Sequence, residues 1–278
     1  MAFRIYHAPD QVLIESAGEL RAATKPFSFD DLFQSDDPLA QVNSAYEAGS
    51  PAHELPDRLA APMGHQEVWA AGVTYFRSRT ARMEEAETAG GDIFYDKVYE
   101  AERPELFFKA TAPRTRGHGD LVAIRSDSSW DVPEPELTLA INRSGQIFGY
   151  TIGNDMSSRS IEGENPLYLP QAKVYTGSCA MGPCLLVGPP PSSSTSISIA
   201  IERDGETGFS GETDLSQLKR GLEELAEFLF RSNEFAFGAF LMTGTGIVPD
   251  SDFTLLAGDV ISITIEGIGT LTNAVEVV

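Results

Sequence analysis

Apolar and polar residues alternate with period two over several stretches of the chain, and this pattern predicts half-buried β-strands. Ile197, Ile199 and Ile201 share one face of such a stretch, and the Asp-Gly pair that follows predicts a hairpin turn. Residues 258–271 alternate in the same way. Because this alternation of apolar and polar residues begins near residue 65 and continues to the end, we expect a mainly β fold of the α+β class.

One segment has helical periodicity instead. Asp214, with Gln217 three residues later, has the pattern of a helix start. A stripe of leucines then recurs at helical spacing: Leu215, Leu218, Leu222, Leu225 and Leu229. The pattern predicts one continuous helix that begins at Asp214 and packs its leucines against the core.

The first 64 residues differ from the rest in their pattern of apolar and polar residues. They mix short apolar pieces with polar loops and end in a run rich in Pro and Gly. A chain of 278 residues is long enough for a large domain and a small one. We therefore predict a small N-terminal domain over 1–64 and a catalytic domain over 65–278.

The composition restricts the partners and the compartment. With 41 acidic and 20 basic residues the net charge is −21, which repels nucleic-acid backbones. No apolar run approaches the roughly 18 residues of a membrane span, and the N-terminus lacks the pattern of a signal peptide. We expect a cytoplasmic protein with no nucleic-acid or membrane partner, whose Cys179 and Cys184 are buried and free.

Three carboxylates surround a predicted hairpin between residues 130 and 155. Period-two geometry places Glu134 and Glu136 on one face of the first strand and its leucines on the opposite, core-facing side. A turn at Ser144 and Gly145 would bring Asp155, at the far end of the second strand, beside the start of the first.

Clustered carboxylates repel one another unless a cation lies between them, and Mg²⁺ or another hard divalent ion prefers such oxygen ligands. The residues alone also fit a solvated strand edge, with Asp155 as a helix cap. A metal site and a solvated edge are both open on this evidence.

The sequence motifs around these residues resemble those of the fumarylacetoacetate hydrolase family. They are, in order, EPEL, GYTIGNDMSSR, KVYTGSCAMGP, GTG and LAGDVISITIEGIGTLTN, within residues 65–278. The resemblance implies a mixed β roll or sandwich with a small N-terminal domain, and an assembly into dimers or tetramers. It also implies that Glu134, Glu136 and Asp155 hold Mg²⁺, or Mn²⁺ or Ca²⁺ in its place.

The family contains hydrolases of acylpyruvates, oxaloacetate decarboxylases and sugar-acid dehydratases. Its hydrolases carry a segment similar to GxNYxxHxxE, whose His and Glu activate water. Here the matching segment is GVTYFRSR, with Thr74 in place of the Asn and Ser78 in place of the His. None of the chain's histidines has the required spacing: His7, His53, His65 and His118.

Longer sequence segments resemble the branch of the family that dehydrates 2-keto-3-deoxypentonates to 2,5-dioxopentanoate. These segments are RPELFFKA, RSDSSWDVPEPEL and IEGENPLYLPQAKVY. The resemblance implies that Glu105 and Lys173 transfer protons, and Lys109 matches a family lysine near the metal. In this chemistry a 2-keto acid chelates the ion, which stabilises the enolate left when Lys173 removes a C3 proton, and Glu105 protonates the departing hydroxyl.

Other residues are weaker candidates for substrate binding. Thr245, between two glycines, lies in a loop that suits close approach of a carboxylate, although such a loop is also typical of a strand bend. Arg77, Ser78 and Arg79 fit a lid over the substrate and equally fit a solvated helix face.

Two alternatives to the dehydratase stay open. One is a hydrolase of 2,4-diketo acids or an oxaloacetate decarboxylase of the same family, and the other is a protein that binds 2-keto acids without catalysis.

Overall fold

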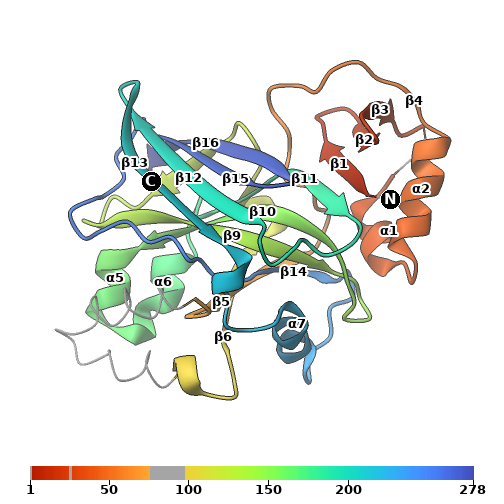
Figure 1. The fold of residues 1–278 in the computed structure, drawn as a ribbon. Helices are drawn as coiled ribbons and strands as arrows, with labels where there is room; N and C mark the ends of the chain where they lie inside the picture. The colour runs from red at the N-terminus through yellow and green to blue at the C-terminus, as the bar shows by residue number, and fades with distance from the viewer. Residues whose placement is uncertain (1, 25–26, 76–97) are drawn as a thin grey trace.

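The computed structural model describes residues 2–24, 27–75 and 98–278. Within them the fold is mainly β, as predicted, with two packed sheets and short helices around them (Figure 1). The larger sheet runs in the order β4 (Ser50–Pro51), β3 (Glu19–Ala22), β2 (Val12–Ser16), β1 (Phe3–His7), β11 (Cys179–Val187), β10 (Ile147–Ser158), β9 (Asp131–Ile141), β14 (Ala239–Met242), β5 (Glu67–Gly72) and β6 (Glu105–Thr111), and β7 (Thr115–Arg116) pairs with β11.

The smaller sheet and the helices complete the architecture. The sheet runs in the order β13 (Glu206–Asp214), β12 (Ser196–Arg203), β15 (Val260–Ile265), β16 (Gly269–Val277) and β8 (Leu121–Ile124). The α-helices are α1 (Phe29–Gln34), α2 (Pro38–Glu47), α5 (Arg159–Glu164), α6 (Leu169–Lys173) and α7 (Leu222–Phe230), and the 3-10 helices are η2 (Ala112–Arg114), η3 (Pro166–Tyr168) and η4 (Leu215–Gln217).

The two faces of the larger sheet bury different clusters. On one face Leu137 and Leu139 pack in a cluster with Ile199 of the smaller sheet. On the other, Ala140 belongs to a cluster with Phe33 of α1. Strand β9 is therefore buried on both faces along its whole length.

The alternating strands are confirmed. Ile197, Ile199 and Ile201 are buried on one face of β12, and β15 pairs with the same strand. The predicted turn follows, with positive φ at both Asp204 and Gly205, as the tight hairpin from β12 to β13 requires.

The prediction of one helix from Asp214 is wrong. Asp214 caps only η4, by accepting a hydrogen bond from the amide of Ser216. The chain then leaves helical geometry because the amide of Lys219 bonds to the carbonyl of Thr74, and Gly221 is extended. Helix α7 starts after Gly221, so the leucine stripe is divided between two elements.

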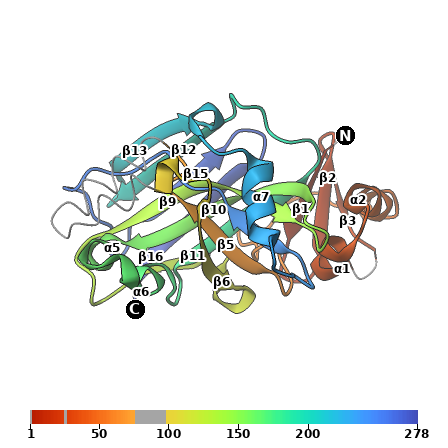
Figure 2. The same cartoon turned by 90° about the horizontal axis from the view of Figure 1, so that it is seen from below.

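The N-terminal strands join the larger sheet, since β1 pairs with β11. Figure 2 shows α1 and α2 at one end of the molecule and α5 and α6 at the other. The division into domains at residue 64 stays a prediction. None of the helices in the described part of the chain is long and apolar enough to cross a membrane.

Candidate metal centre and active site

The hairpin of β9 and β10 brings the three carboxylates together. Asp155 lies directly opposite Glu134, and Gly153 lies opposite Glu136, as antiparallel pairing from the turn dictates. Glu134 is 5% exposed, and Glu136 and Asp155 are each 1% exposed. One oxygen of each residue lies within 4.8 Å of the others. The carboxylates do lie on the face opposite the leucines, but that face is buried, so the solvated edge is excluded.

Three buried cations surround the triad. Lys173 Nζ donates to Glu134 Oε2 at 2.8 Å and to Asp155 Oδ2 at 2.9 Å. Lys109 Nζ lies 2.5 Å from Asp155 Oδ1, and Arg159 Nη2 donates to Glu134 Oε1 at 2.7 Å. Three carboxylates and three basic side chains therefore face one another in a region from which water is largely excluded, and buried ionisable groups require such partners.

Lys109 also connects separate parts of the chain. Besides Asp155, its ammonium donates to the carbonyl of Met156 at 2.9 Å and to the carbonyl of Lys173 at 2.6 Å. Two of the three ammonium hydrogens are thus donated to backbone carbonyls, while its charge is paired with Asp155. Lys109 thus fixes the end of α6, which carries Lys173, against β10.

Burial governs the titration of this cluster. Burial, followed by the charges of Asp155 and Glu134, raises the pKa of Glu136 well above its ordinary value. Burial also lowers the pKa of Lys109, although Asp155 acts in the opposite direction. The amide of Gly244 donates to Glu136 Oε2 at 2.5 Å. Three converging carboxylates are a donor set of hard oxygens, which fits Mg²⁺ or a similar divalent ion.

Glu105 lies on the same face of the sheet, at the start of β6. It is paired with Gly72 of β5, and a Cβ added to Gly72 would overlap its Oε2. The carboxyl group therefore extends over β5 in the direction of the triad. Extending the pairing of Met242 with Thr138 by two residues places Gly72 in one row with Gly244 and Glu136. From β5 to β9 the distance is two strand spacings, about 10 Å.

A cavity of about 710 Å³ opens beside Glu105. Its walls come from residues 103–106 and from residues 165–169, where Leu169 begins α6. Lys173 ends the same helix, and its Nζ lies 5.7 Å from the ring centroid of Phe107. Four residues of helix span about 6 Å, so the cavity lies close to the triad.

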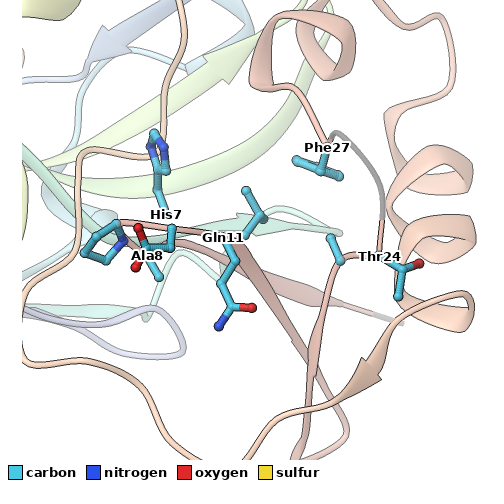
Figure 3. A pocket seen from close by; sticks show the side chains of 9 residues that line it. His7, Ala8, Gln11, Thr24 and Phe27 are labelled. Carbon is cyan, nitrogen blue, oxygen red and sulfur yellow. The ribbon is translucent and has the colours of Figure 1, made fainter.

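A different hollow lies in the N-terminal part of the chain. It measures about 430 Å³, and His7, Gln11, Thr24 and Phe27 are among its lining residues (Figure 3). Its walls come from β1, β2 and the segment after β3, and contain none of the triad residues. We therefore place the candidate site at the triad and the cavity beside Glu105.

The remaining sequence candidates differ in position. Thr245 is buried next to Gly244, which contacts the triad, but its hydroxyl donates to the carbonyl of Ile247 within its own loop. Arg77, Ser78 and Arg79 lie outside the described residues.

The histidines have partners elsewhere. His7 bonds to the carbonyl of Ala61, His65 to Asp30, and His118 accepts from the amide of Thr272. His53 is exposed. Both cysteines are buried and free, as predicted.

Sequence reasoning missed two contacts to the triad, those of Arg159 and of the Gly244 amide. Arg159 was part of the matched phrase GYTIGNDMSSR, and its position just after an apolar strand is a signal that could have found it. The Gly244 amide carries no sequence signal, because any residue except proline has one.

A mainly β protein whose central hairpin buries three carboxylates among cations belongs to the class of metal-centred β enzymes. The family model described as "Fumarylacetoacetate (FAA) hydrolase C-terminal" matches residues 68–276. The chain belongs to the fumarylacetoacetate hydrolase family, as its motifs indicated.

The names of two relatives indicate a dehydratase reaction. The "Probable 2-keto-3-deoxyxylonate dehydratase" of Haloferax volcanii is 44% identical over 285 residues, which cover 94% of this chain and 97% of the relative. The "2-dehydro-3-deoxy-D-arabinonate dehydratase" of Saccharolobus solfataricus is 44% identical over 223 residues, which cover 79% of this chain and 74% of the relative.

A solved structure is similar over the whole chain. It is described as "2-keto-3-deoxy-D-arabinonate dehydratase complexed with magnesium and 2,5-dioxopentanoate". The TM-score is 0.84 at 33% identity, and the match covers 100% of this chain and 99% of that one.

Proposed function

We propose that this protein is a metal-dependent dehydratase that converts a 2-keto-3-deoxypentonate to 2,5-dioxopentanoate. The observation that carries the proposal is the buried triad with Lys173 on it and Glu105 on the same face of the sheet. The names of the two relatives, and the magnesium and product in the similar solved structure, support the same reaction.

Glu134, Glu136 and Asp155 are the residues that would hold the ion, with Mg²⁺ preferred and Mn²⁺ or Ca²⁺ compatible with the same oxygens. When bound, the ion supplies Lewis-acid polarisation of the C2 carbonyl of the substrate. The two positive charges of the ion, added to a charge-balanced cluster, also favour a small anionic substrate such as a 2-keto acid.

Lys173 is the group that removes a proton from C3. Its Nζ lies between Glu134 and Asp155, and its side chain is fully buried, which keeps competing water away. The contact of Lys109 with the carbonyl of Lys173 limits the positions that the amine can take.

Glu105 is the acid that protonates the C4 hydroxyl as it leaves. The C3–H and C4–O bonds break and one water is released, which leaves a C3–C4 double bond. The C5 proton is then transferred to C3 and the C5 hydroxyl proton to C4, so that C5 becomes the aldehyde. The position of the carboxyl over Gly72, between β6 and the triad, suits a group that serves the distal end of a substrate held at the triad.

Further assignments rest on the sequence. Thr245, Arg77, Ser78 and Arg79 are proposed to bind the substrate. The two-domain division at residue 64, a cytoplasmic location and a homo-oligomer, as a dimer or tetramer, belong to the same proposal. The net charge of −21 favours the absence of a nucleic-acid partner.

The test incubates the purified protein with Mg²⁺ and a panel of 2-keto-3-deoxypentonates, acylpyruvates and oxaloacetate, and identifies the products by mass. We expect 2,5-dioxopentanoate from a pentonate. Cleavage of an acylpyruvate or decarboxylation of oxaloacetate without any dehydration would move the protein to another branch of the family, and binding without turnover of any compound would make it a keto-acid binder.

Two variants separate the proposed roles. Lys173→Met should lower turnover by about 10² to 10⁴, the usual contribution of a positioned acid–base group. It should also stop exchange of the C3 hydrogen with D₂O, as followed by NMR. Glu105→Gln should stop dehydration but retain that exchange. Undiminished dehydration by Lys173→Met would remove the lysine from the mechanism.

A further inference from the structure

The cavity beside Glu105 is lined mainly by apolar side chains. Among the described residues that line it, six of nine are apolar: Val98, Pro104, Leu106, Pro166, Leu167 and Leu169. Leu167 is 83% exposed, the highest value among the exposed large hydrophobic residues of the described part of the chain. A polyhydroxylated substrate gains little from such walls, because each hydroxyl placed against them loses a water partner.

The polar lining residues are engaged elsewhere. The guanidinium of Arg103 lies over the ring of Phe228, 5.6 Å from its centroid. Asn165 Oδ1 accepts from the amide of Leu167, which caps η3. Glu105 has the role of proton donor in the proposed reaction. Apolar side chains therefore make up most of the wall that the described residues provide.

The position of the cavity relates it to the distal end of the substrate. If the carboxylate and C2 carbonyl lie at the triad and C4 lies at Glu105, then C5 points beyond Glu105 into the cavity. A pentonate carries only hydrogens and a hydroxyl on C5, so it leaves the apolar walls without a partner. A methyl group on C5 would contact these apolar walls.

We infer that the protein also dehydrates 2-keto-3,6-dideoxyhexonates, whose C5 carries a methyl group. This inference rests on the proposed dehydratase function and names a second substrate class for the same site. The reaction breaks the C3–H and C4–O bonds and releases one water, which leaves a C3–C4 double bond. The C5 proton is then transferred to C3 and the C5 hydroxyl proton to C4, so C5 becomes a ketone, the product is 2,5-dioxohexanoate and no oxidant or reductant is required.

The experiment compares three substrates with the Mg²⁺-loaded protein: a 2-keto-3-deoxypentonate, the matching 2-keto-3,6-dideoxyhexonate, and the 2-keto-3-deoxyhexonate that differs from it only by a hydroxyl on C6. We expect kcat/KM for the dideoxyhexonate within about tenfold of the pentonate, and at least about tenfold above the C6-hydroxylated hexonate. Mass spectrometry identifies 2,5-dioxohexanoate.

A variant assigns the preference to the cavity. Leu167→Ser should lower kcat/KM for the dideoxyhexonate about five- to tenfold more than it lowers kcat/KM for the pentonate. Leu256→Ser, at a leucine 48% exposed and absent from the cavity lining, should change neither value.

The outcomes are distinguishable. Turnover of the pentonate without turnover of the dideoxyhexonate, or with equal turnover of both hexonates, overturns the inference and leaves the proposed function intact. Equal losses on pentonate and dideoxyhexonate in Leu167→Ser also overturn it. Turnover of none of the three overturns both the inference and the proposed function.

Discussion

Asp131, at the start of β9, holds a buried carboxyl group whose removal should stabilise the protein. The residue is 3% exposed, and its Oδ1 has no hydrogen-bond partner among the described residues. Burial raises its pKa to about 6, while the Ser128 hydroxyl and the Arg125 charge act in the opposite direction. The charged form is therefore unfavourable in the folded state at neutral pH.

The sign and the magnitude follow from linkage. In the unfolded chain this carboxyl titrates near 3.8, so between about pH 4 and 6 the folded state binds more protons than the unfolded state. Stability consequently falls as the pH rises through this window. A difference of about two pKa units corresponds to about 3 kcal/mol at most, and Asp131→Asn should raise the free energy of unfolding by about 1–3 kcal/mol at pH 8.

The assay is urea denaturation of the metal-free wild-type and variant proteins from pH 4 to 8. The difference in midpoint should be largest above pH 6 and should disappear near pH 4, with an unchanged m-value. Asp127→Asn is the control, because that carboxylate is exposed and paired with Arg125, and it should give no gain. A gain that does not vary with pH, or a loss at pH 8, would refute the reasoning.

Other predictions concern the active site. Gly72→Ala should displace the Glu105 carboxyl, because the added Cβ overlaps it, and kcat should fall at least tenfold with metal affinity unchanged by calorimetry; Gly208→Ala, where the nearest atom is 3.5 Å away, should not change kcat. Lys109→Met should lower the free energy of unfolding of the metal-free protein by about 3–5 kcal/mol, since it leaves Asp155 with one cation fewer, and an unchanged urea midpoint would contradict this. Chelation should lower the stability measured at 100 times the Kd for Mg²⁺ by about 2.7 kcal/mol, and a melting temperature that does not depend on Mg²⁺ would argue against the metal site.

The hairpin shows how much of the site could be predicted from the sequence. Strand period and turn position together determine register, so the pairing of Asp155 with Glu134 followed from local pattern. The burial of the carboxylates did not, because it depends on β6, α5 and α6 bringing Lys109, Arg159 and Lys173 over that face of the sheet, and no local pattern records which distant segments do so.

The prediction of one continuous helix over residues 214–229 was wrong for a comparable reason. The leucine spacing is compatible with one helix, but Gly221 permits a break, and the chain uses it because Leu218 forms an isolated β-bridge with Tyr75, in the segment after β5. Likewise, the roles of Lys173 and Glu105 were inferred from the family resemblance. The hydrogen bonds of Lys109 to the carbonyls of Met156 and Lys173 could not be predicted, because they join three segments that meet only in the fold.

The balance of three carboxylates by Lys109, Lys173 and Arg159 has a consequence for the order of assembly. A cluster of unpaired acids would oppose folding until an ion arrived, and the chain would depend on metal supply during its synthesis. Here the lysines and the arginine occupy that place from the start, so the polypeptide can reach its final shape alone and acquire its ion afterwards. Loss of the ion would then stop turnover while the chain stays folded, and activity would follow the free magnesium of its surroundings.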